Sequence, residues 1–310
     1  MKKIDISLIM KGFTMGAADI VPGVSGGTVA LITGIYDELV QTISQYDHHL
    51  VKLLLKRQFE SFFKRANLSF LTPLFAGIFT AIISLSKIMH YMMENYSVYT
   101  WSLFFGLIVS SILYIGKNLK NDIAPKSILF VILGTFIGYA IVSLIPVQTA
   151  NTPIMIFLSG AIAICAMILP GISGSFILLI LGKYLFVTAA LKNPFHIESI
   201  STIIIFSLGC LVGLLSFSKV LNYLLSRFHH LMMCTLTGFM IGSLKKIWPW
   251  REVLEKKIVR GKTHILSDQV VFPESLNSEV FIALAIMIFG ILLVFLVERL
   301  GNKRGVSSAG

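Results

Sequence analysis

The sequence predicts an all-α, polytopic membrane protein built from two inverted-topology repeats, each a re-entrant helix hairpin followed by three transmembrane helices. Three observations lead to this prediction. The 310-residue chain is 55% apolar and 13% charged, with a mean hydropathy of +0.84, whereas soluble domains carry roughly 25% charged residues. Several apolar segments approach the roughly 20 residues that cross a bilayer. The pentapeptide Pro-Gly-Val-Ser-Gly at residues 22–26 recurs as Pro-Gly-Ile-Ser-Gly at residues 170–174, 148 positions later.

Apolar segments of two lengths define the expected elements. Four short segments flank the repeated pentapeptides. Proline and glycine break a helix, and lipid cannot satisfy the backbone polar groups that the break exposes. Each pair of short segments therefore predicts a hairpin that returns to its own side of the membrane. The short segments are Ile6–Val21, Gly26–Val40, Ile154–Leu169 and Gly174–Leu191. The six predicted spans are Leu71–Met93, Val98–Tyr114, Ile128–Ile145, Ile203–Leu225, Leu231–Leu244 and Val280–Val297.

The repeat extends well beyond the pentapeptide. Residues 77–112 align without gaps on residues 209–244, an offset of 132, and within them Ser84-x-Ser86-Lys87 matches Ser216-x-Ser218-Lys219. We therefore divide the single membrane domain into repeat 1 (residues 1–150) and repeat 2 (residues 151–310). Because three spans follow each hairpin, the second repeat should be inverted relative to the first, with both termini on one side.

The net charge of +11 does not indicate a nucleic-acid partner. Most lysines and arginines flank apolar segments, where they orient the chain and attract anionic lipid. The basic segment 245–278 is the exception, since the inverted topology places it on the outer side. Either the parity is wrong or this segment attracts an anionic headgroup. The three cysteines have no metal-ligand spacing and are expected in the core, so we predict no metal and no cofactor.

Each pentapeptide predicts an anion site at the start of a helix. Serine after Pro-Gly can cap the helix, glycines allow close approach of a ligand, and the helix start offers unpaired N–H groups with about half a positive charge. Such a site favours phosphate or carboxylate. The expected phosphate ligands are Ser25, Gly26, Gly27, Thr28, Ser173, Gly174 and Ser175, and the expected helix breaks are Pro22, Gly23, Pro170 and Gly171. The two hairpin tips should approach each other near the midplane.

Ionisable residues within apolar segments are functional candidates. Asp19 has Met167 as its counterpart, and it is expected either to carry a proton, which makes it the candidate for proton coupling, or to cap or hydrogen-bond within the hairpin. Lys87 and Lys219 are symmetry mates that either bind an anionic headgroup or extend their ammonium groups to the interface. Lys183 is expected to be an interfacial anchor of the second kind.

Other classes of protein use similar patterns. The breaks could be plain turns between packed helices. Gly-x-Ser-Gly is also the nucleophile pattern of intramembrane serine proteases, but His90 is the only histidine in a predicted span and is a poorly placed base. A lipid-phosphate phosphatase would need an acidic or histidine cluster, which the sequence does not suggest. A transporter or channel for a small soluble anion could use the same helix starts. We predict a carrier rather than an enzyme.

The chain resembles the bacterial polyprenyl-phosphate transporter family over nearly its whole length, and three segments carry this resemblance. They are Met15–Leu31 (MGAADIVPGVSGGTVAL), Leu169–Ser175 (LPGISGS) and Gly242–Trp250 (GSLKKIWPW). The resemblance implies a flippase in the bacterial cytoplasmic membrane that returns undecaprenyl phosphate inward for reuse in wall-polymer synthesis. Its partners would be this lipid and the surrounding membrane lipids. The implied mechanism is alternating access at the two helix starts. The sequence defines no oligomeric partner.

Overall fold

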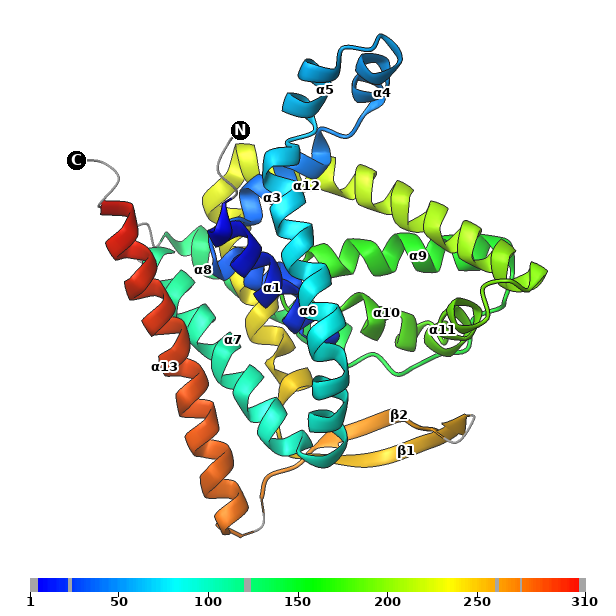
Figure 1. Cartoon of the computed structure of the whole chain (residues 1–310). Coiled ribbons are helices and arrows are strands. Elements are labelled where there is room, and N and C mark those ends of the chain that lie inside the picture. The colour runs from blue at the N-terminus through cyan, green and yellow to red at the C-terminus, as the bar shows by residue number, and fades with distance from the viewer. Residues whose placement is uncertain (1–4, 22–23, 120–123, 260–261, 274, 307–310) are drawn as a thin grey trace.

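A computed structural model describes residues 5–21, 24–119, 124–259, 262–273 and 275–306 (Figure 1). Within these residues, five helices are long and apolar enough to cross a membrane, or six if the bent pair α10 and α11 counts as a span. The predicted class, a helical multi-pass membrane protein, is therefore confirmed. The five are α6 (Leu68–Asn95), α7 (Ser97–Leu119), α8 (Pro125–Val142), α12 (Ile197–Ser243) and α13 (Ser278–Val306).

Helix α12 contains the fourth and fifth predicted spans. Its 47 residues would extend about 70 Å at 1.5 Å per residue, more than twice the roughly 30 Å thickness of a bilayer core. The helix is interrupted at Phe228, where φ is −133° and ψ is 42°. Figure 1 shows α12 changing direction sharply, so that its first part (residues 197–227) and its second part (residues 229–243) are separate rods.

Three short helices, rather than two, form the start of each half. They are α1 (Ile6–Ile20), α2 (Gly26–Ile32) and α3 (Tyr36–Ser44), and then α9 (Pro153–Ile168), α10 (Gly174–Ile180) and α11 (Tyr184–Lys192). The prediction of unbroken helices over Gly26–Val40 and Gly174–Leu191 was therefore wrong. Gly34 and Gly182 stop α2 and α10 with φ of +69° and +66°, a conformation that favours glycine. Helices α10 and α11 are bent by 117°.

Glycines allow α1 to lie against α6, and α9 against the first part of α12, in near backbone contact. A Cβ added at Gly77 would lie 2.1 Å from the carbonyl oxygen of Ile9. At the aligned Gly209 it would lie 2.0 Å from the carbonyl oxygen of Phe157. These distances exclude any side chain, and small residues serve this purpose wherever membrane helices pack closely. The same contact is thus made in both halves.

The third long helix of each half packs against the other half. Helix α8 lies on the second part of α12, and α13 lies on α7. A Cβ at Gly238 would approach the carbonyl oxygen of Val131 to 2.3 Å, and one at the aligned Gly106 would approach that of Met287 to 2.1 Å. This exchange interlocks the halves, so that neither forms a separate body.

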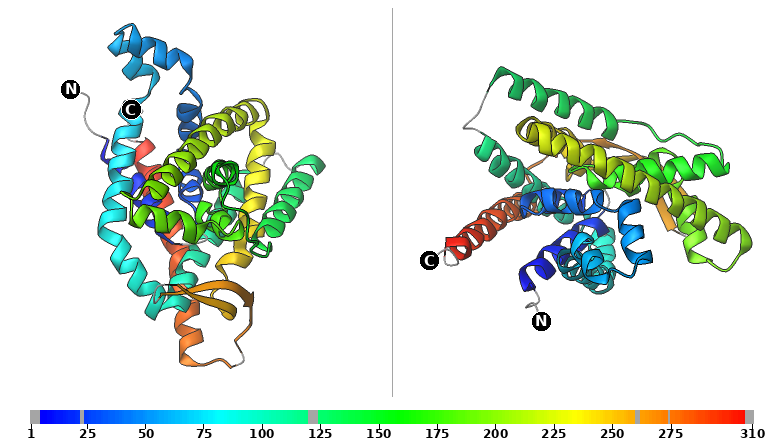
Figure 2. Two further views of the ribbon diagram at one scale, coloured as in Figure 1. Left: turned by 90° about the vertical axis from the view of Figure 1, so that its right-hand side faces the viewer. Right: turned by 90° about the horizontal axis from the view of Figure 1, so that it is seen from above.

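The polar segments occupy opposite ends of the molecule. Helices α4 (His48–Leu55) and α5 (Phe59–Arg65) lie at one end, together with the start of α1 and the end of α13 (Figures 1 and 2). The strands β1 (Arg251–Val259) and β2 (Lys262–Val270) form an antiparallel hairpin at the other end. A short 3₁₀ helix, η2 (Leu244–Ile247), leads into it. The all-α class holds for the rest of the described chain, and this two-stranded hairpin at the basic segment is an addition that was not predicted.

Large apolar side chains cover the outside of the long helices. Ile83 on α6 is 79% exposed and Phe136 on α8 is 69% exposed. Exposed apolar surface on this scale is costly in water and is what a lipid environment favours. The buried core lies between the halves and includes Leu74, Leu236 and Met240. The two pentapeptide segments lie beside this core.

Candidate functional site

The two segments around the repeated pentapeptides, which we call the motif segments, are in direct contact. Ser25 caps α2 by accepting a hydrogen bond from the N–H of Gly27 at 3.1 Å, and its hydroxyl donates to the carbonyl oxygen of Met167 at 2.9 Å. The hydroxyl oxygen of Thr28 accepts a hydrogen bond from the N–H of Gly171 at 2.9 Å. Both side chains are buried. The structure therefore brings the two segments together, and in this conformation both hydroxyls hold one segment to the other.

The breaks differ in how much of them is described. Pro22 and Gly23 lie outside the described residues. At the second break Pro170 is buried and Gly171 has a φ of +85°. A Cβ at Gly171 would lie 2.6 Å from the hydroxyl oxygen of Ser243, so conformation and space both require glycine. The backbone there runs irregularly between the end of α9 and the start of α10, as the proline predicts.

The motif glycines allow close approach, but of the chain's own atoms. A Cβ at Gly27 would lie 2.5 Å from the carbonyl oxygen of Ile168, and one at Gly174 would lie 2.8 Å from that of Ala163. These glycines thus let α2 meet the end of α9, and α10 fold back on α9. The close approach that was predicted for a ligand is made here by other parts of the backbone.

The two helix starts differ in charge. The carboxylate of Asp19 accepts a hydrogen bond from the N–H of Gly26 at 2.7 Å, in the place predicted for a bound anion. Its counterpart Met167 has no such group. At the start of α10 the hydroxyls of Ser173 and Ser175 instead bond to each other at 2.7 Å. The first start therefore has an anion supplied by the protein, and the second has two hydroxyls.

The predicted headgroup lysines lie apart from the motif segments. Lys87 on α6 and Lys219 on α12 are both exposed. Within the described residues, no hydrogen bond or ion pair joins either side chain to the pentapeptides. His90 lies nearby on α6 and pairs with Glu94 at 3.1 Å. The hydroxyl of Ser25 donates to a carbonyl, so His90 and Ser25 do not form the serine–base pair that a protease needs.

Lys183 is fully buried, and its prediction as an interfacial anchor was wrong. Its ammonium group donates to the carbonyl oxygens of Thr149 and Ala150 at 2.7 and 2.9 Å and to the side-chain oxygen of Asn151 at 2.6 Å. The left-handed turn at Gly182 directs the chain so that this side chain points inward. The only sequence signal for this contact was the short polar run after Val147, which supplies the acceptors.

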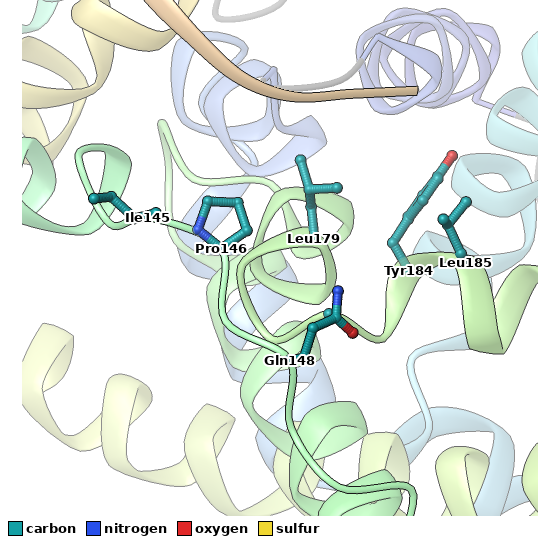
Figure 3. Close-up of a pocket in the computed structure, with 7 residues that line it drawn as sticks. Ile145, Pro146, Gln148, Leu179, Tyr184 and Leu185 are labelled. Atoms are coloured by element: carbon teal, nitrogen blue, oxygen red, sulfur yellow. The ribbon is translucent and has the colours of Figure 1, made fainter. Parts of the chain in front are cut away.

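A pocket of about 200 Å³ opens beside the same turn (Figure 3). Tyr184 and Leu185 line it from α11, Leu179 lines it from α10, and Ile145, Pro146 and Gln148 line it from the connection that precedes α9. The counterpart of Tyr184 is Tyr36, which is 1% exposed and packed in the core. The equivalent positions are therefore open in the second half and closed in the first.

Known proteins share sequence similarity with this chain over most of its length. A family described as undecaprenyl phosphate translocase-like matches residues 15–264. A polyprenyl-phosphate transporter from Vibrio cholerae is 41% identical over 305 residues, covering 96% of this chain and 97% of that protein. One from Staphylococcus aureus is 33% identical over 256 residues, covering 78% and 85%. No solved structure matches. These names describe transporters, not enzymes, and the chain belongs to the undecaprenyl phosphate translocase-like family.

Proposed function

We propose that this protein moves undecaprenyl phosphate across the bacterial cytoplasmic membrane and returns the carrier lipid inward for wall-polymer synthesis. The names of the family and of both relatives support the substrate class. The observation that carries the proposal is the contact between the two motif segments, where the start of α2 meets the second break inside a helical membrane protein. Transporters commonly place their substrate site where broken helices of two repeats meet.

The proposed architecture is an inverted pair, repeat 1 over residues 1–150 and repeat 2 over residues 151–310, each with a re-entrant unit. Several features support it. The glycine contacts of Gly77 and Gly106 recur at Gly209 and Gly238. The second part of α12 runs toward the β-hairpin end, whereas its counterpart α7 runs away from it (Figure 1). The basic hairpin lies at the opposite end of the molecule from the start of α1 and the end of α13 (Figure 1), as an odd number of spans per repeat requires.

The proposed phosphate site is formed by the two helix starts. Ser25, Gly26, Gly27 and Thr28 would provide one side, and Ser173, Gly174 and Ser175 the other. Because the hydroxyls of Ser25 and Thr28 now bond to the opposite segment, substrate binding requires the segments to separate. The phosphate would then replace these bonds with its own, since it accepts strongly from N–H and hydroxyl donors. Lys87 and Lys219 would contact headgroups outside this site.

The proposed mechanism is alternating access. The difference between Tyr36, which is closed in, and Tyr184, which lines a pocket, supports a molecule with one side open at a time. Asp19 is the proposed proton-coupling residue. Its carboxylate occupies the start of α2, so an incoming phosphate would compete with it for the same N–H. Protonation of Asp19 would weaken its hold on Gly26 and favour the exchange.

Transport into vesicles tests the proposal. The purified protein is reconstituted with undecaprenyl phosphate, and an impermeant phosphatase reports how much lipid phosphate reaches the outer leaflet, with and without a pH gradient. We expect Ser25→Ala/Ser173→Ala and Gly26→Leu to slow transport. The matched control is Ser84→Ala/Ser216→Ala, since these exposed hydroxyls bond only within their own helices. Wild-type rates in the first two variants would count against the site, and no transport by wild-type protein would count against the function.

A further inference from the structure

An open groove of about 400 Å³ runs between α8 and the second part of α12. Ile132 and Phe136 form its apolar wall on α8. Gly242 forms the floor, because a Cβ there would lie 2.3 Å from the carbonyl oxygen of Thr135. The missing side chain thus allows the close helix contact, and the groove opens beside this contact. The site proposed above does not include this groove.

One end of the groove is cationic. The ammonium group of Lys245 donates to the hydroxyl of Ser143 at 2.8 Å and lies 4.6 Å from the ring centroid of Tyr139. The phenol oxygen of Tyr139 is 3.5 Å from the same nitrogen. Within the described part of the chain, no carboxylate pairs with Lys245. This half-buried cation lies beside two hydroxyls and has no counter-ion among the described side chains, and phosphate would supply one.

The apolar end is open to the surroundings of the helices. Phe136 is 69% and Ile132 is 58% exposed, on a helix that is long and apolar enough to cross a membrane. A hydrocarbon chain could therefore enter sideways from the membrane without crossing water. An apolar trough that ends in a cation matches a lipid with an anionic headgroup, not a free anion.

The cationic end also adjoins the second break. Ser243, next to Gly242, is the residue whose hydroxyl fills the space beside Gly171. Lys246, next to Lys245, places its ammonium group 4.5 Å from the ring centroid of Phe176 on α10. The turn at residues 242–246 therefore has the groove on one side and the second motif segment on the other. A groove that only binds bulk phospholipid would not have to lie beside the second motif segment.

We propose that this groove is the lateral docking site for the polyprenyl phosphate. Its prenyl chain lies along Ile132 and Phe136, and Lys245, with Ser143 and Tyr139, holds the phosphate before it reaches the second break. This inference rests on the proposed function and adds a second, peripheral contact for the same substrate. The headgroup docks at the β-hairpin end of the molecule, and the wall of the groove selects for a long apolar chain.

Equilibrium binding of undecaprenyl phosphate to the full-length protein, in nanodiscs of neutral phosphatidylcholine, tests this site. Loss of a charge-assisted hydrogen bond worth about 1.5 kcal/mol converts to about tenfold weaker binding for Lys245→Gln. Lys245→Arg should retain most of the affinity, and Ile132→Trp, which fills the groove, should lower it. The matched control is Lys126→Gln, since Lys126 is an exposed lysine at the opposite end of α8 and its loss should change nothing.

Competitors separate the possible sources of the signal. Undecaprenol lacks the phosphate and inorganic phosphate lacks the chain, so neither should displace the lipid at equal concentration. Equal displacement by phosphatidylglycerol would overturn the choice of occupant. Equal binding by wild type and Lys245→Gln, in a preparation that transports the lipid, would overturn the docking site and leave the proposed function intact. Failure of the wild type to bind or transport the lipid would overturn both.

Discussion

The hydroxyl oxygen of Thr28 accepts a hydrogen bond from the N–H of Gly171 at 2.9 Å, across 143 positions of sequence. With the bond from Ser25 to Met167, it closes the two motif segments onto each other. Each half thus uses its helix break to hold the other. A transporter that opens between these segments must break both bonds.

Thr28→Val should destabilise the closed arrangement. Valine keeps the shape but leaves the N–H of Gly171 buried and unpaired, at a cost of about 1–3 kcal/mol. We expect a lower thermal unfolding midpoint in detergent. Thr80→Val is the control, because the hydroxyl of Thr80 bonds only to a carbonyl of its own exposed helix turn. Equal midpoints for the two variants would contradict a joining role for Thr28.

Substitution of a glycine at a close helix crossing should reduce the yield of folded protein far more than substitution of a glycine that has open space beside it. Gly209→Ala would place a Cβ 2.0 Å from the carbonyl oxygen of Phe157, which forces α9 and α12 apart. We expect loss of folded, membrane-inserted protein by size-exclusion chromatography. Gly116→Ala meets no atom within 4 Å and should be neutral or slightly stabilising, because alanine favours helices. Similar yields of the two variants would show that the close crossing is not required.

Removal of the Lys183 ammonium should loosen the connection before α9. Lys183→Met leaves the three acceptors of Thr149, Ala150 and Asn151 without their donor, and each hydrogen bond to a charged group contributes about 1.5–3 kcal/mol. We expect faster proteolysis at residues 147–152 and a lower unfolding midpoint. Lys126→Met is the control. Unchanged protection of this connection in Lys183→Met would contradict the anchoring role.

Asp19→Asn should separate transport from the pH gradient. Asparagine still accepts a hydrogen bond from the N–H of Gly26 but cannot release a proton, so any transport that remains should respond less to an imposed gradient than in wild type. Glu60→Gln, on the exposed surface of α5, removes a carboxylate elsewhere and should retain the response. A full response in Asp19→Asn would eliminate Asp19 as the coupling residue.

The inverted topology predicts that Lys56 and Lys256 lie on opposite sides of the membrane. Lys56 ends α4 and Lys256 is in β1, at opposite ends of the molecule (Figure 1). A single cysteine placed at each position should react with an impermeant maleimide from one side only, and from different sides. The residue at 256 should be labelled from outside the cell. Labelling of both from the cytoplasm would rule out an odd number of crossings per repeat.

The sequence by itself determined the class and most element positions. Apolar length identifies long helices because a span must satisfy its backbone internally, and α6, α7, α8 and α13 lie where it predicted them. The repeated Pro-Gly likewise located the breaks, since a proline followed directly by a glycine strongly disfavours a continuous helix. The short third helices were missed because a single glycine such as Gly34 is compatible with a helix until its φ is known. The β-hairpin was missed because its polar residues carry no apolar period.

Only the tertiary structure decided which groups meet. Lys183 looked like a lysine at a membrane interface, and its burial depends on carbonyl acceptors some 30 positions away in the chain. The contacts of Ser25 and Thr28 depend on the packing of α2 against the end of α9, and the groove at Lys245 depends on α8 crossing to the other half. Hydropathy indicates whether a segment lies in lipid or in water. Which helices pack together depends on their shape, because glycines let the backbones of particular helix pairs approach closely.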